Sequence, residues 1–395
     1  MSSTIKNKIV AALAIAAFVF SGSIPAFAQS SKHKSSRKGK QVTAQLTMEP
    51  TQPAGWKSPD TAKLYPDTCA DRSSEPYVSR YPDIPIIDAH THAAGKCSTV
   101  KSYLRVSEII KKEYHSDLAC WINLDKWVDP ITSVDSIVKA SDCRMLCSFG
   151  DYDVHIYTAR EIAQKKKEGY LGCKFWFGPY YRRMTDSTHL IKYIDDPRLA
   201  TMFKAMEKSG MPMTSLHIAD PNGPFSDRGE WCADPVFFWG QIRSLENVVR
   251  KYPKLTFVIA HGAWLNNQDA QLDYMRYLLD TYPNLYIDIA ATFQYYRLLD
   301  RNNLRDFMIR YADRIIYGTD VSDESEGDPE GIAARYARTF RILETADTVK
   351  GGGFFSGADV KGLNLPRVVL ERIYYKNVLR IYSLSLKDGK LIMEK

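Results

Sequence analysis

Residues 86–92 read IIDAHTH, an apolar, β-rich run that ends in two histidines, and this stretch decides how the rest of the sequence is interpreted. Alternate residues of an extended strand point to the same face. The spacing therefore predicts that Asp88, His90 and His92 project together, while Ala89 and Thr91 project to the other side. Two imidazoles on one face can bind a metal ion, although an isolated pair is also found as buried, hydrogen-bonded histidines. The residues that follow along the chain decide between these interpretations.

A unit of a short β-rich run, a polar junction and a helix-length amphipathic segment repeats from residue 84 onward. The helix-length segments have apolar residues at helical spacing and end at Gly or Pro. Eight strands alternating with helices predict an α/β fold, the (β/α)8 TIM barrel. A doubly wound open sheet is disfavoured because no G-x-G-x-x-G follows the first strand. The predicted strands are residues 84–90, 118–124, 144–150, 172–178, 211–217, 255–261, 285–291 and 314–320.

The composition is that of an ordinary globular protein, with 395 residues, 45% hydrophobic and 25% charged. Its formal net charge is +7, but residues 1–50 contain seven Lys or Arg and a single Glu. The predicted barrel is therefore close to neutral. A nucleic-acid-binding domain would have its positive charge on the folded part, so we expect no nucleic-acid partner.

The N-terminal residues have the pattern of a cleaved export signal. Lys6 and Lys8 precede the apolar residues 9–20, and residues 26–28 read AFA, the small-x-small pattern of a cleavage site. The apolar stretch is shorter than the ~20 residues that span a bilayer, so we expect no membrane span and a periplasmic or secreted protein. The predicted organisation is a signal peptide at 1–28, a linker and irregular N-terminal arm at 29–83, and a barrel with a C-terminal helix at 84–395.

The cysteine pattern excludes two kinds of site. Seven cysteines are an odd number and no C-x-x-C is present, which argues against a regular disulfide framework and against a thiolate zinc site. One disulfide among Cys69, Cys97 and Cys232 is left open.

Six side chains that can bind a metal or transfer a proton lie in or at the ends of the predicted strands. They are His90 and His92 in the first strand, Lys174 in the fourth, His217 in the fifth, His261 in the sixth and Asp320 in the eighth. The carboxyl ends of all barrel strands converge on one face, where barrel enzymes build their active sites. The sequence therefore predicts that these six side chains meet at one site.

These motifs together resemble the amidohydrolase superfamily of metal-dependent hydrolases. IIDAHTH, FVIAHGAW (257–264) and IIYGTDVS (315–322) are similar to strand signatures of the branch that contains aminocarboxymuconate-semialdehyde decarboxylase. VVLERIYYKNVLRIYSL (368–384) resembles the helix with an Asn that ends its domain. The resemblance covers about residues 84–384 and implies a TIM barrel of the metal-dependent hydrolase type. It also implies that the barrel forms a homodimer, as relatives often do.

Neutral imidazoles and a carboxylate suit zinc or another divalent metal such as manganese. We assign His90, His92, His217 and Asp320 to one ion. Such an ion lowers the pKa of a water molecule and polarises a substrate carbonyl. Asp320 and His261 are the expected catalytic acid and base groups.

The role of Lys174 has alternatives. The resemblance implies that in binuclear members a lysine near this place is carboxylated and bridges two metals, whereas the closer branch tends to hold one. A substrate-facing cation and a barrel-interior residue are the other interpretations of Lys174. We expect Asp88 either to orient a metal ligand through a hydrogen bond or to be a barrel-interior carboxylate paired with Lys174 or a neighbour. We expect Asp288 to be structural.

Loops on the same face provide candidate substrate-binding residues. Tyr181, Arg182 and Arg183 follow the fourth strand and could hold an acidic substrate, and Trp264 follows the sixth. The first functional expectation is an exported metal-dependent hydrolase that cleaves a C–O or C–N bond of a small carbonyl substrate. The alternative is a metal-dependent decarboxylase of an aromatic or unsaturated carboxylic acid, and the third is a non-catalytic binding barrel.

Overall fold

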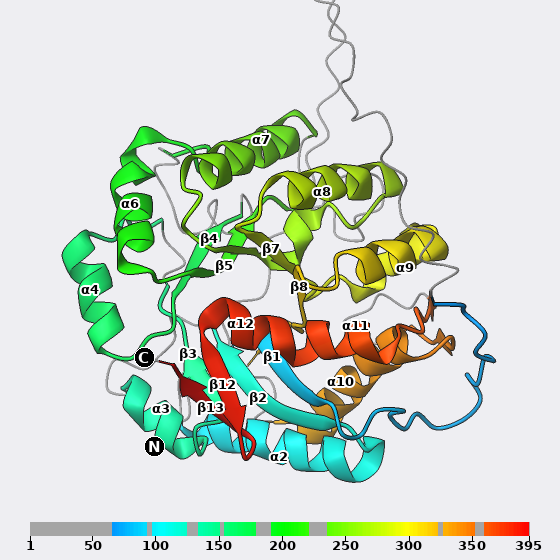
Figure 1. Cartoon of the computed structure of the whole chain (residues 1–395). Coiled ribbons are helices and arrows are strands. Elements are labelled where there is room, and N and C mark those ends of the chain that lie inside the picture. The colour runs from blue at the N-terminus through cyan, green and yellow to red at the C-terminus, as the bar shows by residue number, and fades with distance from the viewer. Residues whose placement is uncertain are drawn as a thin grey trace, which may run out of the picture. The chain divides into compact units, whose positions relative to one another are not determined.

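Figure 1 shows a computed structural model of the chain. Each of the eight predicted strands is present within the described residues. The strands are β1 (Pro85–His92), β2 (Asp117–Asn123), β3 (Met145–Cys147), β4 (Cys173–Phe177), β5 (Met213–Ile218), β6 (Phe257–Ile259), β7 (Leu285–Asp288) and β8 (Ile315–Ile316). β6 and β8 are shorter than predicted because the chain soon turns into left-handed backbone, at His261 and Asp320. The structure describes residues 65–92, 97–124, 133–150, 154–178, 191–220, 235–322, 327–351 and 359–394.

The strands are parallel and close into a ring. They form one sheet in the order β3-β2-β1-β9, where β9 is Val321–Ser322, and a second in the order β4-β5-β6-β7-β8. A parallel bridge between Phe149 and Cys173 joins the β3 end of the first sheet to β4. On the other side, the backbone N–H of Ala89 in β1 donates to the carbonyl of Tyr317 after β8, at 3.1 Å. The fold is therefore the predicted (β/α)8 TIM barrel.

Helices connect the strands and cover the barrel (Figure 1). They are α2 (Cys97–Tyr114), α3 (Val134–Ala140), α4 (Ala159–Lys167), α6 (Ala200–Ser209), α7 (Pro235–Lys251), α8 (Asp269–Thr281), α9 (Arg301–Arg310) and α10 (Pro329–Glu344). Local sequence signals fix several of their ends. Thr158 and Glu161 form a capping box at the start of α4, and Gly210 ends α6 at φ 69°.

A C-terminal segment packs against the barrel strands. It consists of α11 (Arg367–Glu371), a π-helical turn (Arg372–Lys376), α12 (Asn377–Tyr382) and a hairpin of β12 (Leu384–Lys387) and β13 (Lys390–Met393). The side-chain amide of Asn377 donates to the carbonyls of Ala312 and Ile315, each at 2.7 Å. Tyr382 OH donates to the carbonyl of Thr214 at 3.0 Å. The predicted helix with its Asn therefore completes the domain.

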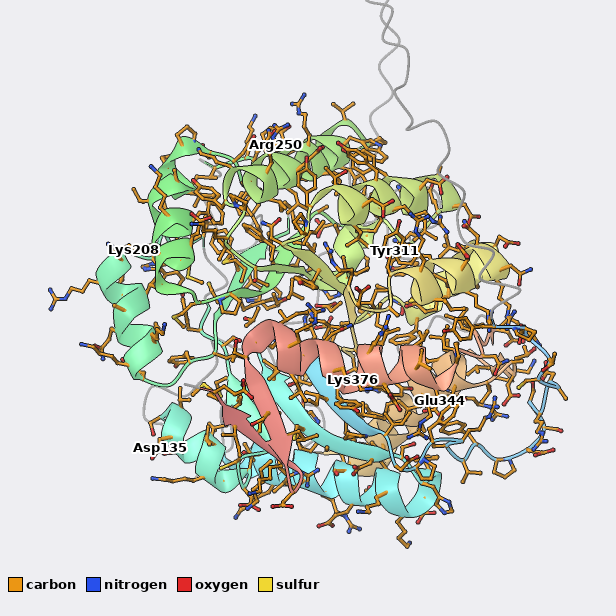
Figure 2. The ribbon with its side chains drawn as sticks, viewed as in Figure 1. Asp135, Lys208, Arg250, Tyr311, Glu344 and Lys376 are labelled. Atoms are coloured by element: carbon orange, nitrogen blue, oxygen red, sulfur yellow. The ribbon has the colours of Figure 1, made fainter. Side chains whose placement is uncertain are left out.

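The part of the arm that precedes β1 lies on α10. Tyr77 OH and Ser79 Oγ donate to Glu344 Oε2 at 2.9 and 2.8 Å, near the end of that helix (Figure 2). Two antiparallel strands, β10 (Thr348–Val349) and β11 (Val360–Lys361), follow α10.

Some predictions concern residues outside the described ranges. The signal peptide, most of the linker and Cys232 lie there, as does the side chain of Cys97, while Cys69 is a free thiol. Among the described residues, every helix is too short or too polar to cross a bilayer.

Candidate metal centre

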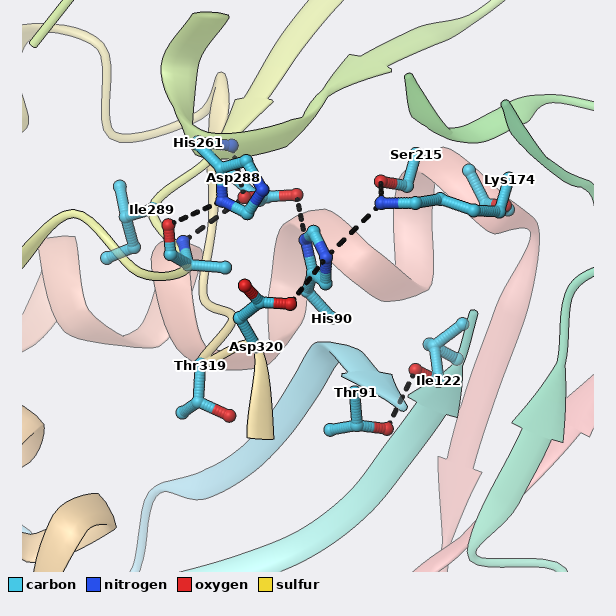
Figure 3. Close-up of polar contacts among 12 residues, drawn as sticks. His90, Thr91, Ile122, Lys174, Ser215, His261, Asp288, Ile289, Thr319 and Asp320 are labelled. Carbon is cyan, nitrogen blue, oxygen red and sulfur yellow. Dashed lines mark hydrogen bonds and ion pairs between the residues drawn. The ribbon is translucent and has the colours of Figure 1, made fainter. Parts of the chain in front are cut away.

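His90, His92 and Asp320 meet at the carboxyl end of β1 and after β8. Figure 3 shows His90 and Asp320 facing each other. One carboxylate oxygen of Asp320, Oδ1, lies 3.0 Å from His92 Nε2 and 3.4 Å from His90 Nε2. Both histidines are buried, whereas the Asp320 side chain is 26% exposed. The three ligand atoms all lie within 4.8 Å of one another. We call His90, His92 and Asp320 the cluster. Three of the four predicted metal ligands thus converge as the sequence predicts.

The separations of these atoms fit a shared metal ion. Ligand atoms that bind one ion at ~2.1 Å with tetrahedral or octahedral angles lie ~3.0–3.4 Å apart. The two measured separations from Asp320 Oδ1 are 3.0 and 3.4 Å. Two imidazoles and a carboxylate are also the donor types that zinc and manganese accept.

Asp288 in β7 sets the orientation of His90. Nδ1 of His90 donates to Asp288 Oδ2 at 2.8 Å (Figure 3), which leaves the lone pair of Nε2 for the cluster. The other oxygen, Oδ1, accepts from the backbone N–H groups of His261 at 2.9 Å and Ala290 at 3.1 Å. Burial alone would raise the pKa of Asp288, but the neighbouring imidazole of His90 lowers it overall. An ionised Asp288 therefore ties β1 to the chain after β6.

His261 is held in one tautomer. Its Nδ1 lies 2.8 Å from the carbonyl of Ala290, and because a carbonyl only accepts, Nδ1 carries the proton. Nε2 is then the unprotonated nitrogen of the neutral ring. Burial lowers the pKa of His261 well below its usual range. His261 can thus act as a proton acceptor or a metal ligand at neutral pH.

His217 lies beside the cluster but is not one of the three residues whose ligand atoms lie within 4.8 Å of one another. Its ring centroid is 4.9 Å from that of His261, which is itself 4.9 Å from that of His90. Burial, followed by the charge of Lys174, lowers the pKa of His217 well below its usual range. The ring is therefore neutral, as a ligand must be. Its assignment as the fourth ligand stays a prediction.

Two indole rings flank the histidines. The Trp176 ring stacks on His217 at 5.7 Å and 21° and lies 5.3 Å from His92. The Trp264 ring stacks on His261 at 4.6 Å and 24°. Trp264 therefore lies beside the site, and its predicted role in substrate binding stays a prediction. Among the described residues, its buried indole N–H has no hydrogen-bond partner. Nothing in the spacing of the sequence singles out Trp176.

The expectation that Asp88 shares a face with the histidines is wrong. The register between β1 and β2 shifts between Asp88 and Thr91, so one extra residue in β1 breaks the alternation. Asp88 points instead toward α10, where Tyr336 OH donates to it at 2.6 Å. Its other oxygen accepts from the backbone N–H groups of His90 at 3.0 Å and Thr319 at 3.2 Å. Asp88 thus holds the backbone at His90 and at Thr319, which precedes Asp320. Burial raises the pKa of Asp88 to about 6.

Lys174 lies deeper in the barrel than His217, by two residues along the strands. In the register of β4 and β5, Lys174 pairs with Ser215, and Trp176 is the residue that pairs with His217. The Lys174 ammonium donates to Ser215 Oγ at 3.0 Å and lies 3.4 Å from His90 Nε2 (Figure 3). It also lies 4.2 Å from the centroid of the Trp176 ring. Lys174 is therefore a fully buried neighbour of the cluster, two residues before Trp176 in β4.

The backbone around the site is strained. His261, Ala263 and Trp264 have φ values of 56°, 51° and 59°, and Asp320 has φ 67°. Left-handed backbone costs an L-residue about 1–2 kcal/mol. Hydrogen bonds hold these positions: Asp288 accepts from the N–H of His261, and the carbonyl of His90 accepts from the N–H of Asp320 at 2.8 Å. Strain concentrated at these residues is typical of a functional site.

Gly318 leaves room for the side chain of His90. A Cβ at this position would lie 2.7 Å from the Cβ of His90. The glycine of the GTD motif is thus required by the close approach of β8 to His90.

Three predicted substrate-binding residues, Tyr181, Arg182 and Arg183, lie outside the described residues. Ser215, Trp176 and Asp288 contact the site without having been predicted to do so. Polar character at strand positions was the only signal available for Ser215 and Asp288.

Comparisons with known proteins place the chain in context. A family model described as Amidohydrolase matches residues 159–384, which is more than half of the chain. No curated protein matches the sequence.

Several solved structures are similar at low identity. An uncharacterized TIM-barrel protein from Bordetella bronchiseptica is 15% identical, with a TM-score of 0.46 over 76% of this chain and 98% of that one. 5-Carboxyvanillate decarboxylase from Sphingomonas paucimobilis is 14% identical, with a TM-score of 0.40 over 77% and 100%. A dihydroxybenzoic acid decarboxylase from Polaromonas sp. JS666, with bound manganese, is 13% identical, with a TM-score of 0.37 over 78% and 80%. At these sequence identities and TM-scores, the similarity does not identify an activity for this chain.

Proposed function

The chain belongs to the amidohydrolase family, and on that premise we propose that it is a metal-dependent carboxy-lyase that removes carbon dioxide from an aromatic or unsaturated carboxylic acid. The observation that carries the proposal is the pair of indole rings, Trp176 and Trp264, that stack on the histidines of the cluster. Flat conjugated substrates pack well against aromatic side chains.

We propose that His90, His92 and Asp320 hold one divalent metal, with His217 as the predicted fourth ligand. When bound, the metal acts as a Lewis acid that holds and polarises the oxygens of a substrate carboxylate or carbonyl. Zinc and manganese both suit the donor set.

The reaction requires one proton. The C–C bond to the carboxylate breaks, carbon dioxide leaves with both oxygens, and the electron pair left on the substrate carbon takes up a proton. His261 Nε2 and the Asp320 carboxylate are the groups of the site that can move this proton. The carbonyl of Ala290 fixes the His261 ring so that Nε2 is the atom that exchanges it.

A second candidate function is hydrolysis of a C–O or C–N bond. The 26% exposure of the Asp320 side chain favours it, because water can reach the carboxylate that would accept its proton. The same metal ligands and the same His261 would serve this reaction.

Product analysis separates the two candidates. The metal-loaded protein is incubated with panels of aromatic acids, unsaturated acids, esters, lactones and amides, and carbon dioxide and hydrolysis products are measured separately. Carbon dioxide that is released by the protein and not by a His261→Asn variant supports the carboxy-lyase. Hydrolysis without carbon dioxide from any acid would replace it with the hydrolase.

The place of action is a separate proposal. We propose that residues 1–28 direct export and are removed, leaving a periplasmic or secreted enzyme for a small carboxylate, and that the barrel forms a homodimer. Mass measurement of the protein from each cell fraction and sedimentation analysis test these points.

A further inference from the structure

A cavity of about 380 Å³ lies far from the metal centre, where the N-terminal arm meets the end of α10. Its lining includes Cys69, Arg72, Tyr77 and Arg80 from the arm, and Arg341 and Asp347 from the end of α10 and the turn after it. The arm leads into the amino end of β1, whereas the metal ligands stand at the carboxyl end of that strand. We call this space the arm cavity. Its volume is within the range of small-ligand sites.

Three guanidinium groups line the arm cavity, and two of them are fixed in place. Arg341 donates from Nε to Asp347 Oδ2 at 2.7 Å and from Nη2 to the carbonyls of Arg72 and Glu75 at 2.8 and 2.9 Å. Arg80 donates from Nη1 to Asn364 Oδ1 at 2.8 Å. Fixed guanidinium groups lose little entropy when they bind an anion.

Donors of these groups remain available for a ligand. Within the part of the chain that the structure describes, the hydrogen bonds of Arg341 use Nε and Nη2, and those of Arg80 use Nη1. Among the described residues, the ion-pair contact of Arg72, whose side chain is 71% exposed, is with Glu75 at 4.0 Å. An oxyanion that enters the cavity can therefore accept hydrogen bonds from more than one guanidinium without displacing a protein contact.

The buried carboxylate of the cavity, Asp347, is already satisfied by hydrogen bonds. Asp347 accepts from Arg341 through Oδ2 and from the backbone N–H of Arg72 through Oδ1, at 2.8 Å. The last carbonyls of α10 are capped as well: Thr345 Oγ1 donates to that of Arg341 at 2.8 Å, and Arg80 to that of Glu344 at 3.4 Å. Among the lining residues, three guanidinium groups against the carboxylates of Glu75 and Asp347 leave a formal excess of one positive charge. The electrostatics therefore favour an anion.

We propose that the arm cavity binds a small oxyanion, a carboxylate or a phosphate, that bridges Arg72 of the arm and Arg341 of α10 and fastens the arm to the barrel. The site is independent of the catalytic chemistry proposed above. Its ligand binds the folded arm more tightly than the unfolded chain, so saturation raises the stability of the protein.

Thermal unfolding of the full chain, titrated with inorganic phosphate or with succinate at constant ionic strength set with sodium chloride, tests the proposal. Constant ionic strength removes general screening as a cause. We expect a saturable rise in Tm, and for Arg72→Gln a concentration for half-saturation about tenfold higher. The phosphate and succinate arms identify which oxyanion is preferred. Arg105→Gln is the matched control, because Arg105 forms a similarly exposed i,i+3 pair with Glu108.

Hydrogen exchange of residues 68–80 is the second readout, because it reports on the arm itself. We expect the preferred anion to slow exchange there in the native sequence and in Arg105→Gln, and not in Arg72→Gln. A Tm rise of equal midpoint in Arg72→Gln and the native sequence would overturn the proposal by locating the anion elsewhere. The absence of any saturable effect with both anions would overturn it as well.

Discussion

Asp288 accepts a hydrogen bond from Nδ1 of His90 at 2.8 Å, and this contact decides which nitrogen of His90 faces the cluster. Both groups are buried, so the contact is not weakened by water. It aligns the Nε2 lone pair with His92 and Asp320 before a metal arrives.

Replacing Asp288 should therefore weaken metal binding. Asp288→Asn keeps the size of the side chain and removes the charge that supports the His90 tautomer. We expect a loss of about 10–100-fold in metal affinity, measured by competition with a chromophoric chelator. Asp280→Asn, at a 47% exposed site, is the control and should bind metal normally. Equal affinities for the two variants would show that Asp288 does not orient His90.

Trp264 should determine substrate binding without affecting the metal. In Trp264→Ala we expect KM for a substrate acid to rise about tenfold or more, with unchanged metal content, because an aromatic face is lost. Trp264→Phe separates the contribution of the ring from that of the indole N–H. Trp239→Ala, which removes a 40% exposed indole on α7, is the control. A fall in kcat at constant KM would contradict a role in substrate packing.

Gly318 should tolerate no side chain. The Cβ of Gly318→Ala would lie 2.7 Å from the Cβ of His90, so we expect a loss of about 1–3 kcal/mol in the free energy of unfolding together with weaker metal binding. Gly210→Ala is the comparison: it strains a positive-φ position with open space around it, at the end of α6. That variant should lose stability and retain metal affinity. Normal metal affinity in Gly318→Ala would argue against tight packing at His90.

Glu344 should make stability depend on pH. Burial raises the pKa of Glu344, which accepts hydrogen bonds from Tyr77, Ser79 and Tyr374. A carboxyl whose pKa is higher in the folded state stabilises the fold below its unfolded pKa, and this contribution is lost as pH rises through the folded pKa. The free energy of unfolding of the native sequence, measured by denaturation from about pH 4 to about pH 7, should thus fall relative to that of Glu344→Gln. A constant difference between the two would contradict a raised pKa.

Much of the fold and part of the site could be predicted from the sequence. The strands and helices follow from hydrophobic periodicity, and the convergence of His90, His92 and Asp320 follows from the geometry of a parallel barrel. The placement of Asp88 could not be predicted, because the bulge in β1 is not visible in the alternation of residue types.

The residues that contact the predicted metal ligands could not be predicted from the sequence, for a different reason. Asp288 contacts His90 across 198 positions of the sequence, and its strand position does not reveal which histidine it faces. Trp176 has the same apolar character as its neighbours Phe175 and Phe177, so only the register with His217 distinguishes it. Long-range register of this kind is set by tertiary packing and leaves no local pattern.

The metal content of the purified protein, measured by elemental mass spectrometry beside a His90→Ala/His92→Ala variant, tests the central claim most directly. We predict about one zinc or manganese ion per chain, lost in the variant. Two ions per chain would contradict the single-ion site and assign Lys174 a bridging role. No metal after repletion would contradict a metal-dependent enzyme altogether.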